Sequence, residues 1–421
     1  MRQTQTRDDR NAGRARKDPP RSMQPPSERD LTSAVAALAP LVAAHCDADQ
    51  RDRRLAKPLV AALRASGLLR LWMPRELGGL EADPETVITL LESIAALDGS
   101  VGWNFLVGIT HGSFGAYLTE EAARTIWGRD PDVIIASSFG PTGRAVVVDG
   151  GYRVTGRWSF ASGIHQADWL CGGCVIADGD QPRSGSDENP ERLLLFFRAE
   201  DAEILDTWHT GGLRGTGSQD FTVRDLFVPH GYGFDLLRTT GRVDGPLYRR
   251  PFLAEGNLHG VAFAAVALGI ARHAIEAFVD LAGGKVPAGR SRTLLRDRPL
   301  AQLQVAQAEA LVLAARAFLL DATRKAWASI LEHGAASDLE LARVRLALVH
   351  AGESSLRATE MMHRAGGSSA VYAKSALDRC LRDAHAASQH IQMNPEHYFT
   401  VGAILLGQSG ARRETPPPSS P

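Results

Sequence analysis

The first third of the chain carries apolar residues at helical spacing. Between 29 and 130 they recur every three or four positions, which places them on one helix face and predicts an N-terminal α-helical domain. Ser27 and Asp30 form a start signal for the first helix, Pro58 suits the first turn of the next, and Gly67 suits its end. The apolar positions of the first helix are Leu31, Val35, Leu38, Leu41 and Val42.

The middle of the chain changes to the two-residue alternation that is typical of strands. A hairpin is predicted around the turn at 149–151, because apolar residues alternate on both sides of its Asp-Gly-Gly sequence. Runs of β-branched and aromatic residues at 191–200 and 220–229 predict further strands. The segment 131–240 is therefore predicted to be a central antiparallel β domain.

From 241 to 410 the pattern is helical again and predicts a C-terminal four-helix bundle, which makes the chain an α+β protein. The segment 258–283 is apolar on nearly all sides and is expected to be a central helix. Two further helices carry apolar stripes at spacings of three and four, and we expect these stripes to face the core. The stripes are Leu303, Ala306, Ala310, Leu313 and Ala317 in one helix, and Leu341, Val344, Leu348 and Ala351 in the other.

Composition narrows the class of protein. Residues 1–28 and 411–421 have few large apolar side chains and are expected to be disordered tails. A formal net charge of −1 argues against a nucleic-acid or anionic-membrane partner. A charge or glycine breaks every apolar run of eighteen, so no transmembrane helix is expected, and the N-terminus lacks a signal core. Four cysteines are too few for a disulfide framework, which favours a reduced, cytoplasmic protein.

The sequence offers no strong metal or nucleotide motif. Cys171 and Cys174 form a C-x-x-C, but the surrounding run reads as a strand and favours small buried residues over a redox or zinc site. His390 and His397 could share a helix face, but Pro395 breaks such a helix. Neither a phosphate-binding P-loop nor a dinucleotide-binding glycine motif is present. No metal site is predicted.

Several polar residues occur in unusually apolar or glycine-rich surroundings. Each one alone is more often structural, since a histidine on an apolar face is usually hydrogen-bonded in the core and a serine at a strand end usually forms a turn. Together, beside Trp158 and Trp169, they suit a flat, polar aromatic ligand such as an isoalloxazine. These residues are His111, Ser137, Ser138, Ser162, Arg214 and His390.

Two blocks make the chain recognisable. GYRVTGRWSFASGIHQADWLCGGCVI at 151–176, followed by GLRGTGSQDFTVRDLFVP at 212–229, resembles the acyl-CoA dehydrogenase superfamily. More narrowly, it resembles the flavin-dependent monooxygenase branch, the oxygenase components of two-component aromatic hydroxylases of the 4-hydroxyphenylacetate and steroid-phenol type. The resemblance extends over about 31–407. It implies an N-terminal helical domain, a central β domain and a four-helix bundle, with a homotetramer whose flavin lies between β domain and bundle and is completed by a neighbouring subunit.

The C-terminal region departs from the dehydrogenases of that superfamily. They take a substrate proton with a carboxylate from a YEG-like motif near the end of the bundle, and this motif is absent from RDAHAASQHIQMNPEHYFTVGAILLG. His390 occupies the neighbourhood where monooxygenase members place an active-site histidine. Glu396 is the visible carboxylate, but its context suggests the first turn of a helix, where an acid satisfies local N–H groups.

The resemblance also implies roles for individual residues. Ser162 is expected to hydrogen-bond the flavin N5 edge. His390 is expected to act as a base toward a substrate hydroxyl or as a hydrogen-bond donor, because an imidazole titrates near working pH. His111 is a second candidate for the same site, and His165 is a weaker one.

Further residues are implied as cofactor contacts. Ser137 and Ser138 are expected at the pyrimidine side or the phosphate chain, with Phe160 at the ring. Arg214 is expected to tether a glycine-rich loop at the flavin edge, against the alternative of a plain tight turn. Arg292 is expected to reach a neighbouring subunit's flavin phosphate, although its local spacing departs from the family pattern.

The function expected from this resemblance is aromatic hydroxylation. A separate NAD(P)H:flavin reductase would supply reduced flavin, FMNH₂ or FADH₂, and O₂ would add to it as a C4a-hydroperoxide that transfers oxygen to a phenol. The alternatives are N- or S-oxygenation on the same scaffold, acyl-CoA dehydrogenation with Glu396 as base, and a non-catalytic binding protein.

Overall fold

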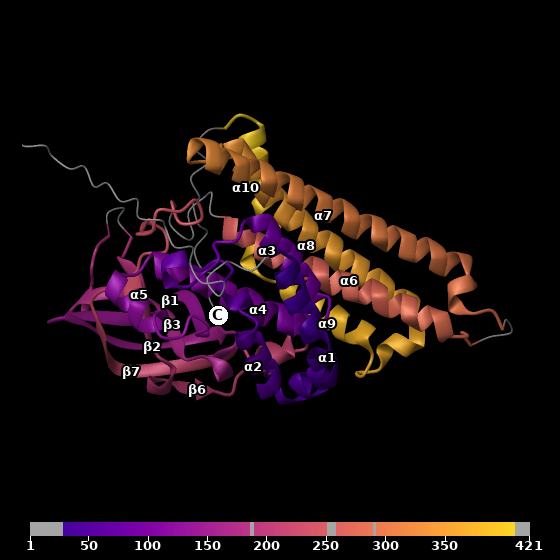
Figure 1. Ribbon diagram of the computed structural model, residues 1–421, viewed down its shortest axis with the longest axis horizontal. Helices are drawn as coiled ribbons and strands as arrows, with labels where there is room; N and C mark the ends of the chain where they lie inside the picture. Colours follow the sequence, from indigo (N-terminus) through magenta and orange to yellow (C-terminus); the bar gives the residue numbers. More distant parts are fainter. Residues whose placement is uncertain (1–27, 186–188, 251–257, 289–291, 409–421) are drawn as a thin grey trace, which may run out of the picture.

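The computed structural model describes residues 28–408 except 186–188, 251–257 and 289–291, so the predictions for both tails fall almost wholly outside the described residues. The helices of the N-terminal region and the sheet form one half of the molecule, and three long helices form the other (Figure 1). Between them lie α3 (Pro84–Ala95) and α4 (Gly99–Gly112), which pack against α6 (Val261–Gly284) of the bundle, while α4 also packs against β1 (Ile135–Val148).

The N-terminal helices begin and end as their sequences indicate. Asp83 accepts from Thr86 N and Asp98 accepts from Ser100 N, which caps two successive helices. The chain turns at Gly67, whose φ is +69°. The helices are α1 (Glu28–Asp52), α2 (Lys57–Ala65), α3 (Pro84–Ala95), α4 (Gly99–Gly112) and α5 (Glu120–Trp127).

The central sheet has the strand order β6-β7-β2-β1-β3-β5-β8, with β4 paired to β3. It differs from the fully antiparallel prediction in one pairing, because β1 and β3 run parallel. After the β1–β2 hairpin the chain crosses back through η5 (Ile164–Gln166) and adds β3 to the other edge of β1. The strands are β1 (Ile135–Val148), β2 (Gly151–Ala161), β3 (Trp169–Asp178), β4 (Gln181–Pro182), β5 (Arg192–Arg198), β6 (Glu203–Leu205), β7 (Gln219–Pro229) and β8 (Gly233–Phe234).

The C-x-x-C lies inside this sheet, where both cysteines are fully buried in β3. Its glycines have a packing role, because a Cβ at Gly172 would lie 2.5 Å from the Trp158 ring. Trp158 stacks on Phe221 and donates from its indole nitrogen to Gly173 O at 2.8 Å. The motif therefore makes room for a buried tryptophan, as its strand-like context indicated.

The C-terminal region is helical, with α6 packed against α3, α7, α8 and α9. Helix α6 is buried on most sides, as its sequence predicted. Ser337 and Glu340 form a reciprocal capping box at the start of α8. The helices are α6 (Val261–Gly284), α7 (Pro299–His333), α8 (Asp338–Gly366), α9 (Ala376–Ser388) and α10 (His397–Leu405). The short 3₁₀ turns are η2 (Leu68–Arg70), η3 (Arg75–Leu77), η4 (Ser113–Ala116), η6 (Ala199–Asp201), η7 (Arg214–Thr216), η8 (Leu258–Gly260), η9 (Leu295–Asp297), η10 (Gly367–Val371) and η11 (Ile391–Met393).

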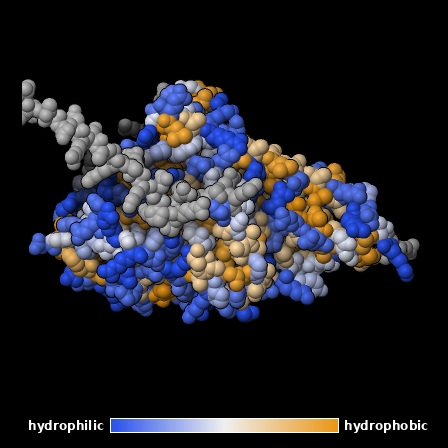
Figure 2. Space-filling view, viewed as in Figure 1, coloured by the Kyte–Doolittle hydropathy of each residue, from blue (hydrophilic) through white to orange (hydrophobic). Residues whose placement is uncertain are grey.

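The stripe predicted to be the core face of α7 is wrong. Leu303 and Leu313 are 54% and 51% exposed, whereas the buried face carries Ala308, Val312 and Leu319. Helix α7 thus has two apolar faces, and its outer one belongs to the apolar patches along the bundle half of Figure 2. The predicted inner stripe of α8 is correct, since Val344, Leu348 and Ala351 are buried.

By length and composition alone, three helices of the described residues could cross a membrane, which the charges in the sequence had argued against. They are the segments 30–52, 258–284 and 299–333. The second is the core helix of the bundle, which accounts for its apolar character. The third is α7, whose outer apolar face needs another explanation.

Candidate functional site

Trp103 on α4 joins the two residues to which the sequence gave the chemistry. Its indole Nε1 donates to Ser162 Oγ at 3.2 Å, and its ring lies edge-on to the His390 ring, 5.5 Å between centroids. Phe263 on α6 stacks on His390 at 3.9 Å and 13°. The sheet, the N-terminal helices and the bundle therefore each contribute to one cluster.

The hydrogen bonds of His390 define its tautomer. Its Nδ1 accepts from Gln392 N at 3.3 Å, so the neutral ring carries its hydrogen on Nε2. Burial lowers the pKa of His390 to about 4, so the ring is neutral at physiological pH. His390 is therefore prepared to donate a hydrogen bond from Nε2.

His111 has both ring nitrogens occupied within the protein. Nδ1 lies 2.5 Å from Ile135 O and must donate to it, while Nε2 lies 2.6 Å from Ser137 Oγ. Burial lowers the pKa of His111 to about 4, so the ring is neutral and Ser137 donates to it. The structure places His111 and Ser137 together in the interior, with no ring N–H left for a substrate.

Ser138 and Phe160 lie in more open positions. Successive strand residues point to opposite faces, so the half-buried Ser138 side chain lies across β1 from Ser137. Phe160 is 71% exposed, with φ at +66°, a conformation that L residues rarely adopt. Its ring lies edge-on to Trp208 at 6.1 Å. An exposed aromatic ring held in a strained backbone beside Ser162 suits stacking by a ligand.

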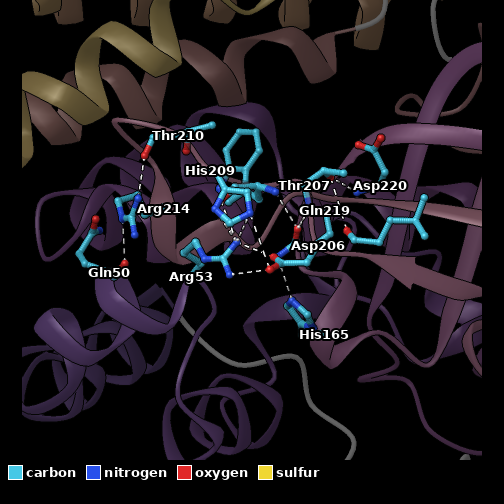
Figure 3. A network of polar contacts seen from close by, with 12 residues as sticks. Gln50, Arg53, His165, Asp206, Thr207, His209, Thr210, Arg214, Gln219 and Asp220 are labelled. Carbon is cyan, nitrogen blue, oxygen red and sulfur yellow. Dashed lines mark hydrogen bonds and ion pairs between the residues drawn. The ribbon is translucent and has the colours of Figure 1, made fainter.

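The loop 206–219 is fastened to α1 by a polar network (Figure 3). Arg53 at the end of α1 contacts both Asp206 carboxylate oxygens, at 2.5 and 3.1 Å. Gln219 Oε1 accepts from the backbone nitrogens of Thr207 and Trp208, each at 2.7 Å. The backbone of Trp208, whose ring contacts Phe160, is thus hydrogen-bonded by both Arg53 and Gln219.

Arg214 anchors this loop, while its place at a flavin edge stays a prediction. Its Nε donates to Gln50 O on α1 and its Nη1 to Thr210 O, each at 2.9 Å (Figure 3). Both partners are backbone carbonyls, so the guanidinium crosslinks main chain to main chain.

Three candidates lie away from this cluster. Arg292 is exposed and belongs to the connection between α6 and α7. This connection lies at the bundle end furthest from the sheet (Figure 1). Glu396 is exposed just before α10, which removes the support for it as a buried dehydrogenase base. His165 is exposed on η5, with its Nε2 3.4 Å from Gln219 Nε2.

A flavin fits the open side of the cluster better than its interior. The cavity that touches Ser162 and Asn104 measures about 20 Å³, the size of one water molecule. This cavity is therefore far too small for the three rings of the flavin that was expected between the β domain and the bundle. The exposed Phe160, with the Ser162 hydroxyl two residues away, offers a stacking surface and a polar edge group, which is the chemistry that an isoalloxazine needs.

Trp103, Phe263, Thr216 and Ser218 were missed by the sequence analysis. Trp103 had a signal, since it is the one tryptophan in the glycine-rich stretch that also holds His111. Phe263 lies among apolar helix residues and had none. Thr216 and Ser218 lie between the glycines of the recognised loop.

Comparisons with known proteins agree with this architecture. Residues 261–395 match the family model "Acyl-CoA dehydrogenase, C-terminal domain". The chain is 34% identical to oxygenase subunit HsaA of a flavin-dependent monooxygenase from Mycobacterium tuberculosis, covering 89% of this chain and 95% of the relative. It is 32% identical to indole-3-acetate monooxygenase from Pseudomonas putida, covering 85% and 89%. It superimposes on XiaF from Streptomyces sp., solved with FADH₂ and glycerol, with a TM-score of 0.83 at 26% identity, covering 92% and 97%.

These alignments extend over most of both chains, so the similarity is not confined to the bundle. The fold prediction is confirmed, including the three-part order of helices, sheet and bundle. The chain belongs to the flavin-dependent monooxygenases with the acyl-CoA dehydrogenase fold, as an oxygenase component that uses reduced flavin.

Proposed function

We propose that this protein hydroxylates an electron-rich aromatic substrate, a phenol in the first instance, with His390 binding the substrate oxygen and Ser162 the flavin. The observation that carries the proposal is the shared contact of His390 and Ser162 with Trp103. The indole ring contacts both functional groups and so connects them through one rigid side chain. Reduced flavin, when bound, supplies the activation of O₂.

The chain itself contributes a hydrogen-bond donor that is held in one orientation and shielded from water. A neutral His390 presents Nε2–H to a phenol oxygen and stabilises its ionised, electron-rich form. Phe263 and Trp103 cover the ring and exclude water, which strengthens that hydrogen bond. The structural setting thus supports the donor role for His390 over the role of general base.

Phenols fit this description, whereas an indole ring carries no oxygen that could accept from His390, although indole-3-acetate monooxygenase is one of the relatives. N- or S-oxygenation is the second candidate, and the presence of a donor at His390 favours a substrate that carries an oxygen next to the reacting carbon. Dehydrogenation is disfavoured, because Glu396 is exposed.

Two partners complete the proposal. An NAD(P)H-dependent flavin reductase supplies the reduced flavin. Other copies of this chain cover the outer stripe of α7, where Leu300, Leu303, Leu313 and Leu331 are all more than half exposed. Packing against other copies of the chain in a homotetramer would bury this stripe.

The test uses ¹⁸O₂. The protein is mixed anaerobically with reduced FMN or FAD, and then with ¹⁸O₂ and a panel of phenols, indoles, amines and thioethers. One ¹⁸O atom in a phenol product, with little hydrogen peroxide, supports the proposal. Label only in an amine or thioether product supports the second candidate. Bleaching of oxidised flavin by an acyl-CoA, without oxygen incorporation, would contradict both.

A further inference from the structure

Three buried hydroxyl groups form a hydrogen-bonded chain behind the proposed flavin edge. Ser162 Oγ lies 2.7 Å from Ser218 Oγ, which lies 2.6 Å from Thr216 Oγ1. Thr216 Oγ1 lies 2.8 Å from Leu213 O. The three side chains are at most 8% exposed, so water does not compete along the chain.

The two ends of the chain determine where every hydrogen points. A carbonyl oxygen can only accept, so the single hydrogen of Thr216 lies toward Leu213 O. Thr216 must then accept from Ser218, and Ser218 must accept from Ser162. At the other end the Trp103 indole can only donate, and it occupies one lone pair of Ser162 Oγ.

Ser162 is left with one free hydrogen-bonding position, an acceptor lone pair. The opposite direction would leave Thr216 Oγ1 and Leu213 O at 2.8 Å with no hydrogen between two acceptors, which is unfavourable in a buried site. Leu213 O also accepts from Trp208 Nε1 at 3.1 Å, and this bond cannot be reversed either.

The loop holds the terminal carbonyl in place. Leu213 adopts a left-handed conformation, φ +48°, and its N donates to Asp383 Oδ1 on α9 at 2.6 Å. At Gly217, φ is +55° and a Cβ would lie 2.8 Å from Arg53 O, so only glycine fits between this turn and the end of α1. The backbone on both sides of Thr216 is therefore fixed.

An acceptor at this position distinguishes the two redox states of a flavin. Reduced flavin carries a hydrogen on N5 and can donate to Ser162, whereas oxidised flavin presents a lone pair that faces another lone pair. We propose that Thr216 and Ser218 are positioning residues that fix Ser162 as an acceptor and so make the site select reduced over oxidised flavin. This inference rests on the proposed function, specifically on the placement of Ser162 at N5.

The experiment measures the dissociation constants of oxidised FMN and of anaerobically reduced FMN, and repeats the pair with FAD. Thr216→Val and Ser218→Ala release the chain, so that Ser162 can turn its hydrogen toward oxidised N5. We expect the preference for reduced flavin to fall by about tenfold, the equivalent of one hydrogen bond of ~1.4 kcal/mol. Thr216→Ser keeps the hydroxyl and should restore the wild-type ratio.

Thr359→Val is the matched control, because it removes an equally buried threonine hydroxyl that donates to a carbonyl, 2.8 Å away, inside α8. It should leave the ratio unchanged. Unchanged ratios in both chain variants would overturn the inference. If a variant fails to fold, the midpoint potential of flavin bound to the wild-type protein still tests the inference. The bound flavin must have a midpoint potential above that of free flavin, by about 30 mV per tenfold preference for the reduced form.

A potential at or below that of free flavin also overturns the inference. Failure of this inference and failure of the proposed function give different results. If the wild type binds neither flavin form, the proposed function itself fails. If the wild type binds flavin and hydroxylates a phenol while the ratios stay unchanged, the proposed function stands and only the roles of Thr216 and Ser218 are wrong.

Discussion

Replacing His390 by glutamine and by asparagine tests which ring nitrogen acts on the substrate. A glutamine amide nitrogen reaches the position of imidazole Nε2, and an asparagine amide nitrogen reaches that of Nδ1. In the structure Nδ1 already accepts from Gln392 N, so only Nε2–H is available. We therefore expect His390→Gln to keep substantially more hydroxylation activity than His390→Asn.

The size of the effect follows from the charge on the acceptor. A hydrogen bond to a charged group contributes about 1.5–3 kcal/mol, which corresponds to roughly 10- to 150-fold in rate. His390→Ala should lose this amount. Both amide variants lose the stacking on Phe263, so the difference between them reports the position of the donor.

The assay is a single turnover with preloaded reduced flavin, ended by acid quench and quantified as hydroxylated product against hydrogen peroxide. Because the pKa of His390 is lowered to about 4, the wild-type profile should show no step near pH 6.5 that the Gln variant lacks. Asparagine matching or exceeding glutamine would refute the donor role, as would such a step.

Three further outcomes are expected. Leu313→Arg should split the oligomer in light scattering, whereas Ala61→Arg on the exposed face of α2 should not; equal masses for both would contradict a role for the stripe. Burial lowers the pKa of His259 to about 3, so the wild type should lose stability as the pH falls from about 6.5 toward 3, at up to ~1.4 kcal/mol per pH unit, and His259→Phe should flatten this slope in urea titrations. Burial, with the nearby Asp98, raises the pKa of Asp383 to about 7, so the wild type should lose stability as the pH rises from about 4 to 7, and Asp383→Asn should gain in melting temperature relative to it over that range.

The local elements were predictable because neighbours in sequence determine them. Helix α2 begins with Pro58 in its first turn and buries Leu59 and Leu63, and the β1–β2 hairpin turns at the expected Asp-Gly. The parallel β1–β3 pair was not predictable, since it depends on which edge of β1 the returning chain joins. For α7 the period was right, but a helix with two apolar faces does not reveal which face meets its own core.

The site residues likewise divide into those that the sequence could identify and those that only the fold brings together. Ser162 and His390 could be carried over because their blocks resemble a family. Their connection could not, because Trp103 lies 59 residues from Ser162 in sequence and meets it only through the packing of α4 on β1. Ser137 was expected at the flavin from the same resemblance, yet its hydroxyl donates to His111. The direction of a hydrogen bond depends on which groups surround the hydroxyl, and only the fold determines those groups.

The glycine-rich loop gives a physical reason why flavin binding and substrate binding should be coupled. The two groups of the Leu213 residue serve different parts of the site: its N–H donates to Asp383 on α9, the helix that precedes His390, and its carbonyl ends the hydroxyl chain that orients Ser162. A movement of α9 that shifts His390 therefore also shifts the anchor of Ser162. Ordering a glycine-rich segment costs conformational entropy, and the attachment of Leu213 to both parts of the site offsets this cost. The left-handed angles at Leu213 and Gly217 let the backbone contact α1, α9 and the sheet within a few residues.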